Sequence, residues 1–305
     1  DLHSFPTRRS SDLFVKAGKL RVFEKMSARQ QFKQILTSLQ ATSHPWLTWK
    51  DTINVRALNN NTGTIHLSNL CTEITLPQDK DNIATCNLVS INLSAFLRED
   101  KTWDWDRLQE ASRAAIRQLD NLIDITETPV KEAMHSNQQT RAIGIGVMGF
   151  TDVLEKLGYC YESNEAYELI DQLTEFISYH AIDQSADLAA KLGSYPTYNG
   201  SGWSKGQLPI DTLDELSDNR KLKVKIDRKT RLDWEALRGK VKKGMRNATL
   251  MAIAPTANIG HVAGTTPGID PQFAQIFSRS TLNGKFLEVR SEEHTSELQS
   301  PSLIS

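Results

Sequence analysis

The sequence predicts an α/β fold, arranged as a barrel or as a wound sheet. Segments with the apolar period of helices alternate with short β-branched runs that are typical of strands, and no internal repeat divides the chain. A length of 305 residues suits one large domain or two ordinary ones. The 36 basic and 37 acidic residues nearly balance, so no global field attracts nucleic acid or an anionic membrane. No apolar run approaches the roughly 18 residues of a membrane span, and we expect a globular protein of the cytoplasm.

Apolar stripes with caps or stops predict four helices, over residues 27–40, 106–126, 151–157 and 163–192. Ser27 is expected to cap the first helix, and Pro129 follows the end of the second. Gly158 and Gly193 are expected to end the other two.

Short β-branched or apolar runs predict a strand over residues 64–76, a strand or loop over 84–96, a short apolar segment over 142–150 and a strand-like segment over 248–254. Asp79–Asn82 is expected to form the turn between the first two segments. The third segment is punctuated by glycines. Pro255 closes the last one and opens a loop, Thr256–Gly268, whose backbone N–H groups suit an anion at a helix start. Ordinary turn chemistry is the alternative interpretation of that loop.

The three cysteines, Cys71, Cys86 and Cys160, are too few for a disulfide framework or a zinc site. Cys71 stands between Asn69 and Glu73, and an extended chain would place these three side chains on one face. A carboxylate is costly to bury without a role, so the trio is a candidate reactive site. The alternative is a free cysteine that packs as a small hydrophobe beside two solvated polar groups.

Two further patterns have a functional and a plain interpretation. Gly144–Gly149 satisfies G-x-G-x-x-G, but the acidic residue of a dinucleotide site would be Glu168 or Asp171, and both lie in a helical pattern. Close backbone packing is therefore the favoured interpretation. The stretch Arg220–Arg246 is rich in Lys and Arg, and a solvated helix face is favoured over a phosphate or partner surface.

Four segments resemble, in order and spacing, the catalytic subunit of class I ribonucleotide reductase: NLCTEITLP, ATCNLVSINLSAF, RAIGIGVMGF and NATLMAIAPTANIGHVAGTTPGIDP. The stretches KLGSYPTYNGSGWSKGQLPID and DWEALRGKVKKGMRN extend this resemblance over most of residues 19–289. It implies an incomplete part of a ten-stranded α/β barrel around a loop that carries Cys71. The cobalamin-dependent class usually has Pro and Gly where this chain has Leu70 and Thr72, so it is the less favoured relative.

The resemblance implies thiyl-radical reduction of ribonucleoside diphosphates. Cys71 matches the thiyl position, and Glu73 matches the carboxylate that takes the 3'-hydroxyl proton. Asn69 matches the amide that orients the substrate hydroxyls and that carboxylate. Cys86 matches one thiol of the reducing pair, whose partner is expected upstream of this chain. Cys160 matches no family motif. The residues implied in substrate binding are Ser68, Thr256, Ala257, Asn258 and Ile259.

The resemblance also implies the partners. No metal site and no cofactor are expected in this chain, because a metal-containing small subunit supplies the radical and the allosteric nucleotides bind to segments outside it. Thioredoxin or glutaredoxin and a second copy of the large subunit are expected partners, whereas nucleic acid and membrane are not. A Rossmann oxidoreductase and a truncated, non-catalytic product remain as alternatives.

The two ends have no apolar period: residues 3–13 read HSFPTRRSSDL and residues 290–300 read RSEEHTSELQS. Both strings resemble translated adapter oligonucleotides of short-read sequencing libraries. We therefore expect residues 1–13 and 290–305 to be artefacts, and residues 14–289 to be a partial barrel domain that is inactive alone. Natural flexible tails are the alternative.

Overall fold

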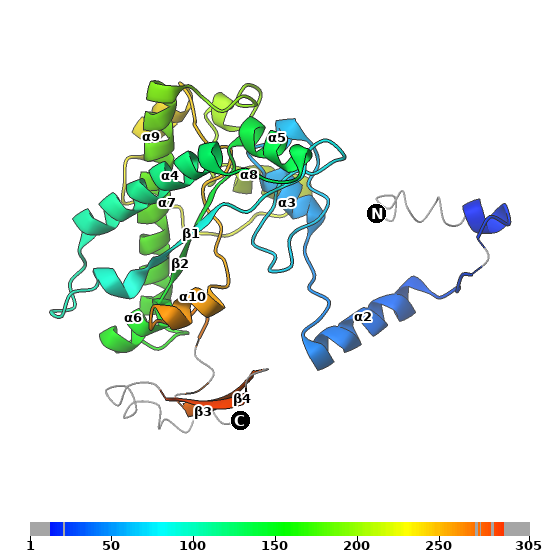
Figure 1. Ribbon diagram of the computed structural model, residues 1–305, viewed down its shortest axis with the longest axis horizontal. Coiled ribbons are helices and arrows are strands. Elements are labelled where there is room, and N and C mark those ends of the chain that lie inside the picture. The colour runs from blue at the N-terminus through cyan, green and yellow to red at the C-terminus, as the bar shows by residue number, and fades with distance from the viewer. Residues whose placement is uncertain (1–12, 21, 272–273, 275, 282–283, 290–305) are drawn as a thin grey trace. The chain divides into compact units, whose positions relative to one another are not determined.

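The computed structural model describes residues 13–20, 22–271, 274, 276–281 and 284–289 (Figure 1). The chain divides into two units, Asp1–Thr48 and Trp49–Ser305. The first unit contains α2 (Ala28–Thr42), which begins where the sequence predicts it, because the Ser27 side chain accepts a hydrogen bond from Gln30 N at 3.1 Å. Its apolar face is present but uncovered, since Phe32 and Leu36 are 52% and 41% exposed.

The second unit contains a parallel sheet, which confirms the α/β class. Strand β1 (Leu88–Asn92) pairs with β2 (Gly144–Met148) in a register that runs from Leu88 opposite Gly144 to Asn92 opposite Met148. The β1–β2 connection contains α4 (Trp105–Ile125) and α5 (Lys131–Thr140), as a parallel crossover requires. All five residues of β2 are buried, as expected for a central strand.

The predicted strand over residues 248–254 is only a single bridge, from Met251 to Ile145 in the parallel direction. Ile145 N donates to Leu250 O at 2.7 Å, and Ala252 N donates to Ile145 O at 3.0 Å. This segment therefore continues the sheet on the side of β2 opposite to β1. It does not form the full strand that we predicted.

The prediction of a strand over residues 64–76 was wrong, and of 84–96 only β1 is a strand, followed by the 3-10 turn η3 (Leu93–Phe96). In residues 64–76, polar side chains form hydrogen bonds with backbone groups that a strand partner would otherwise bond. Asn54 bonds both the N–H and the C=O of Ile65 at 2.8 Å, and Asn69 Oδ1 accepts from Ile74 N at 3.0 Å. The turn at Asp79–Asn82 is confirmed, because Asp79 N donates to Asn82 O at 3.0 Å.

Three other predicted helices are confirmed. They are α4, α6 (Phe150–Leu157) and α7 (Asn164–Leu192), and Gly158 and Gly193 follow the last two with positive φ. The sequence did not predict the shorter elements α3 (Lys50–Arg56), η2 (Asn60–Thr62), α5, η4 (Trp203–Lys205) and α8 (Thr212–Arg220). Helix α9 (Trp234–Val241) lies within the predicted helix face of the basic stretch, and α10 (Ala257–Val262) begins in the loop where a helix start is expected. Among the described residues, no helix is both long and apolar enough to cross a membrane.

The core lies where α4 and α7 cross beside the sheet (Figure 1). Its fully buried side chains include Leu108 and Ile116 of α4, Leu173 and Ile177 of α7, and Ile145 of β2. Burial of each such side chain stabilises the fold by roughly 1.5 to 3 kcal/mol. These contacts fix the sheet whose ends carry the candidate site.

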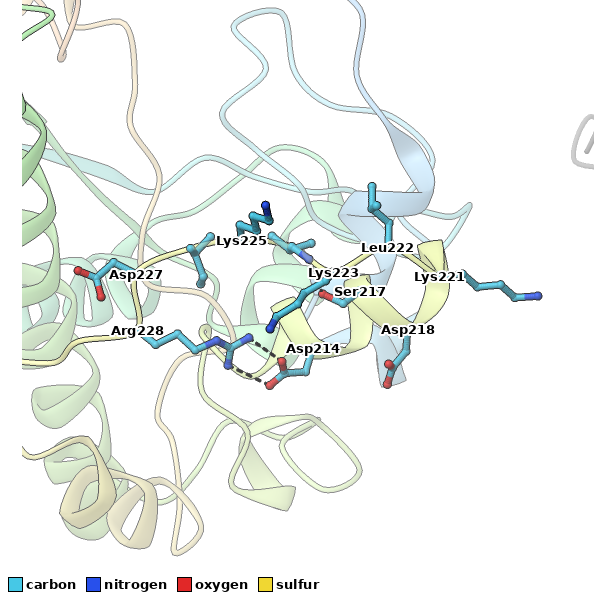
Figure 2. Close-up of a pocket in the computed structure, with 11 residues that line it drawn as sticks. Asp214, Ser217, Asp218, Lys221, Leu222, Lys223, Lys225, Asp227 and Arg228 are labelled. Atoms are coloured by element: carbon cyan, nitrogen blue, oxygen red, sulfur yellow. Dashed lines mark hydrogen bonds and ion pairs between the residues drawn. The ribbon is translucent and has the colours of Figure 1, made fainter.

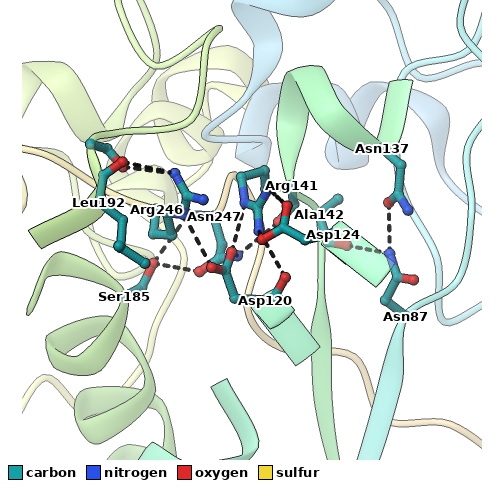
Figure 3. A network of polar contacts seen from close by, with 11 residues as sticks. Asn87, Asp120, Asp124, Asn137, Arg141, Ala142, Ser185, Leu192, Arg246 and Asn247 are labelled. Carbon is teal, nitrogen blue, oxygen red and sulfur yellow. Dashed lines mark hydrogen bonds and ion pairs between the residues drawn. The ribbon is translucent and has the colours of Figure 1, made fainter. Parts of the chain in front are cut away.

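A buried polar network fixes the beginnings of the second and third sheet segments (Figure 3). Arg141, directly before β2, donates through Nε to Asp120 Oδ1 at 2.7 Å and through Nη1 to Asp124 Oδ1 at 2.6 Å. Arg246 and Asn247, before the third segment, donate to the same Asp120 carboxylate at 3.1 and 3.0 Å. Because Asp120 is 1% exposed, α4 holds both sheet segments through one buried charge.

The basic stretch does not have one helical face, contrary to our prediction. Helix α8 ends at Arg220 and α9 begins at Trp234, so the lysine-rich residues between them are not helical. The prediction is correct only for α9, where Leu237 is buried.

The last described element is an antiparallel hairpin, β3 (Ile276–Thr281) and β4 (Gly284–Val289). Its side chains Ile276, Phe286 and Leu287 are 56%, 51% and 70% exposed, and Phe14 and Val22 near the other end are also exposed. The predicted artefacts fall almost entirely on residues 1–12 and 290–305, which lie outside the described residues.

Candidate functional site

Residues 68–74 form a tight loop that brings Asn69 and Glu73 together. Asn69 Nδ2 donates to Glu73 Oε2 at 2.7 Å. Thr72 has φ of 65° and its N–H donates to Asn69 O at 3.1 Å, which closes a turn with Leu70 and Cys71 at its tip. The predicted proximity of Asn69 and Glu73 is correct, but a turn produces it and an extended strand does not.

Cys71 is half-buried at the tip of this loop, whereas the adjacent Leu70 is 87% exposed. Ser68 fixes the base of the loop, because its hydroxyl donates to Ile74 O at 2.7 Å. The polar side chains of the loop therefore hold its shape, and the thiol remains without a hydrogen bond among the described residues.

Cys86 lies two residues before β1 and is exposed. Partial burial raises the pKa of its thiol, and the negative charges of Glu73 and Cys71 raise it further. The structure joins Asn69 to Glu73 by a hydrogen bond, and Glu73 lines a small cavity together with Thr85 and Asn87, the two chain neighbours of Cys86. That Cys71 and Cys86 share one site with this pair stays a prediction.

The backbone beside Cys86 is firmly held. Asn87 is buried, and its Nδ2 donates to Asn137 Oδ1 at 2.7 Å and to Ala142 O at 3.0 Å. Asn87 O accepts from Gly144 N at 2.9 Å, which joins the beginnings of β1 and β2. Cys86 therefore projects from a rigid strand end. Cys71, in contrast, lies on a loop.

A small cavity of about 40 Å³ lies beneath the loop, at the beginnings of the sheet segments. Glu73 lines it together with Thr85, Asn87, Gly144 and Met251, among others. Such a volume holds only one or two water molecules. Cys71, Cys86 and residues 256–259 do not line it.

The predicted substrate loop follows the third sheet segment. Thr256 is buried, and its hydroxyl oxygen accepts from Gly268 N at 2.8 Å, which closes the loop at its base. Ala257, Asn258 and Ile259 are exposed in the first turn of α10. No hydrogen bond among the described residues joins them to the Cys71 loop.

The glycine pattern serves close packing. A Cβ at Gly144 would lie 2.6 Å from Ala252 Cβ, and one at Gly146 would lie 2.6 Å from Ala252 O. These glycines let the third segment approach β2, which confirms the favoured interpretation. Asp171 of α7 was a candidate for the acidic residue of a dinucleotide site. Its Oδ2 instead forms an ion pair with Arg231 Nη1 at 2.7 Å.

A larger open cavity of about 1190 Å³ lies against α8 and the lysine-rich residues after it (Figure 2). Arg228 and Asp214, at its wall, form a two-bond ion pair with distances of 2.5 and 3.1 Å. None of the predicted site residues lines this cavity. Within the described part of the chain, no group of three His, Cys, Asp or Glu side chains is arranged to hold a metal ion.

Asp152, Thr265 and Thr266 surround the far end of the substrate loop, and sequence reasoning missed them. Asp152 Oδ2 accepts from Thr266 N at 2.7 Å and from both threonine hydroxyls. The available signal was weak: an acidic residue in the first turn after Gly149, and paired threonines at the end of a glycine-rich loop.

The comparison with known families agrees with this arrangement. The family described as "Ribonucleotide reductase, barrel domain" matches residues 7–302. The chain belongs to this family. The matched range reaches into both terminal strings, which we predicted to be artefacts.

Named relatives support the same family. The ribonucleoside-diphosphate reductase subunit alpha of Chlamydia muridarum is 44% identical over 274 residues, which cover 89% of this chain and 26% of that protein. The large subunit of Caenorhabditis elegans is 38% identical over 267 residues, 87% of this chain and 32% of that protein. That of Arabidopsis thaliana is 36% identical and is covered to 34%. The chain therefore spans about a quarter to a third of the length of these relatives.

Proposed function

We propose that the full-length protein containing this segment reduces ribonucleoside diphosphates to 2'-deoxyribonucleoside diphosphates by thiyl-radical chemistry. The observation that carries the proposal is the loop with Cys71 at its tip and the hydrogen-bonded Asn69–Glu73 pair beside it, in a chain of the ribonucleotide reductase family. Relatives named ribonucleoside-diphosphate reductase support the substrate class. The cobalamin-dependent alternative has no comparable support.

The residue types suit each step. A thiyl radical on Cys71 abstracts the 3'-hydrogen, because S–H and activated C–H bonds have comparable strengths. Glu73 takes the 3'-hydroxyl proton. The hydrogen bond of 2.7 Å from Asn69 Nδ2 to Glu73 Oε2 orients this carboxylate. The 2'-hydroxyl takes a proton from one thiol of the reducing pair and leaves as water. The two thiols, Cys86 and one outside this chain, also supply two electrons and the hydrogen that replaces the hydroxyl at C2', and they become a disulfide. Glu73 returns its proton to the 3'-oxygen. The 3'-hydrogen then returns from Cys71, which regenerates the thiyl radical.

Substrate binding is proposed for Ser68 and for residues 256–259, of which Thr256 is buried and Ala257, Asn258 and Ile259 are exposed in the first turn of α10. A metal-containing small subunit supplies the radical, and thioredoxin or glutaredoxin reduces the disulfide. Allosteric nucleotides bind outside this segment, the large subunit acts as a homodimer, and the enzyme works in the cytoplasm. Neither nucleic acid nor a membrane is needed for this chemistry.

The test is an assay of the full-length large subunit with its small subunit and a mixture of the four ribonucleoside diphosphates. With a dithiol reductant we expect many turnovers to 2'-deoxyribonucleoside diphosphates. Cys86→Ser should bind substrate and begin the reaction but stall, because one thiol cannot deliver an electron pair. Cys160→Ser, the matched control, should turn over normally. Failure of the active complex to form any deoxyribonucleotide would contradict the proposal.

A further inference from the structure

Asp152 lies in the first turn of α6, just beyond the end of β2, and connects to a loop more than 100 positions away in the chain. Its Oδ2 accepts hydrogen bonds from the Thr265 hydroxyl, from Thr266 N at 2.7 Å and from Thr266 Oγ1 at 3.1 Å. Thr265 and Thr266 are 4% and 0% exposed, so these charge-assisted bonds are shielded from water.

Thr265 and Thr266 also contact the C-terminal ends of β1 and β2. Gly149, directly after β2, donates through N to Thr266 O at 2.8 Å, and the Thr265 hydroxyl lies 3.3 Å from Asn92 Oδ1 at the end of β1. Gly149 has φ of 80°, and a Cβ there would collide with the Thr265 hydroxyl. The anchoring point is therefore built at the C-terminal edge of the parallel strands, where α/β enzymes place their ligands.

Hydrogen bonds within the loop 256–268 connect Thr265 and Gly268 to the beginning of the loop. Thr265 N donates to Gly260 O at 2.9 Å, and Gly260 N donates to Thr256 O at 2.7 Å. Gly268 N donates to the Thr256 hydroxyl oxygen at 2.8 Å. Since these bonds link both ends of the loop, the placement of Thr265 and Thr266 determines the placement of residues 256–259.

We propose that Asp152 is a positioning residue that holds the loop 256–268 in the conformation that binds the substrate diphosphate. The proposal rests on the proposed substrate-binding role of residues 256–259. Asp152 does not touch the substrate. It fixes the loop in advance, so that substrate binding does not have to order it.

The experiment compares Asp152→Ala and the milder Asp152→Asn in the full-length large subunit with its small subunit. The matched control is Glu175→Gln, because Glu175 also accepts three hydrogen bonds from a distant segment, two from Arg231 and one from Trp234 Nε1. Two quantities are measured: KM and kcat for the ribonucleoside diphosphate, and amide hydrogen exchange of a peptide covering residues 256–268.

Asp152→Ala should raise KM about tenfold or more, as expected for loss of charge-assisted hydrogen bonds, and change kcat much less. Exchange in residues 256–268 should accelerate. Asp152→Asn should show smaller changes in the same direction, which keeps the test valid if the alanine variant folds poorly. Glu175→Gln should leave both quantities unchanged.

Unchanged exchange in residues 256–268 of both Asp152 variants would overturn the positioning role. Faster exchange with unchanged KM would also overturn it, because a loosened loop would then have no effect on substrate. That second result would remove residues 256–259 from the substrate site. It would leave the Cys71 chemistry intact, since deoxyribonucleotide formation tests that chemistry separately.

Discussion

Asn69 and Glu73 show how single polar side chains determine the site. The Asn69 amide donates to the Glu73 carboxylate and accepts from Ile74 N, so it satisfies a backbone group that a strand partner would otherwise bond. The same side chain therefore prevents a strand and aligns a carboxylate. The motif letters predicted which side chains of this loop lie together, Asn69 and Glu73, but the β-branched neighbours predicted the wrong backbone.

Removal of the Glu73 charge should change the titration of Cys86. The Cys86 pKa lies above its ordinary value because of burial, Glu73 and Cys71, so Glu73→Gln should lower that pKa. More thiolate should then be present at a given pH, and the midpoint of the alkylation rate against pH should move to lower pH. Mass spectrometry of the alkylated peptide from the full-length subunit measures this midpoint.

Cys160 in the same variant is the internal control, because it is exposed and lies in the turn between α6 and α7. Its alkylation profile should stay the same. If the Cys86 midpoint did not move in Glu73→Gln, Glu73 and Cys86 would not share one site.

At the scale of elements, buried polar groups hold the sheet segments in place. Asp120 of α4 is the common acceptor for Arg141, Arg246 and Asn247, which precede β2 and the third segment. Asp120→Ala would leave two arginines without their buried counter-charge. Removal of one partner of such a buried pair typically costs about 3 to 5 kcal/mol. We expect the local opening free energy of residues 246–252 to fall by that order.

Native-state hydrogen exchange on the full-length subunit measures this opening free energy without assuming two-state unfolding. Asp171→Ala is the matched control, because its side chain is 66% exposed in the ion pair with Arg231. Its loss should cost at most about 1 kcal/mol. Equal effects of the two variants would show that the Asp120 network does not hold the sheet.

The elements also show what the sequence could predict. Helices α2, α4, α6 and α7 were predicted because each combines an apolar stripe with a capping residue or a glycine stop. Helix α5 was missed because its buried residues are Ala133, Ser136 and Asn137, which give no apolar stripe. The Asp152 anchor was missed for a different reason: its threonine partners lie more than 100 positions away, and no local pattern reports such a contact.

At the scale of the whole molecule, the described segment exposes apolar surface. Phe32 and Leu36 of α2, Leu70 of the Cys71 loop, and Phe286 and Leu287 of the hairpin are each at least 41% exposed. Exposed apolar side chains promote association. We expect the isolated 305-residue chain to be poorly soluble and to bind an apolar dye more strongly, per residue, than the full-length subunit does.

Sedimentation and dye fluorescence of both proteins test this prediction. A variant of the isolated chain that lacks residues 1–13 and 290–305 should behave as the isolated chain does, because neither string has the apolar period of a packed element. A soluble monomer that unfolds cooperatively, and that the deletion destabilises, would contradict both the partial-domain and the artefact predictions.

The proposed radical chemistry depends most on Cys71, and one substitution tests the role of this residue directly. Cys71→Ser in the full-length large subunit, with its small subunit and a dithiol reductant, should bind the ribonucleoside diphosphate with nearly unchanged affinity and form no 2'-deoxyribonucleotide. A serine hydroxyl has a much stronger O–H bond than the thiol S–H, so it cannot form the radical that takes the 3'-hydrogen. Normal turnover by Cys71→Ser would contradict the assignment of Cys71 as the radical-bearing residue.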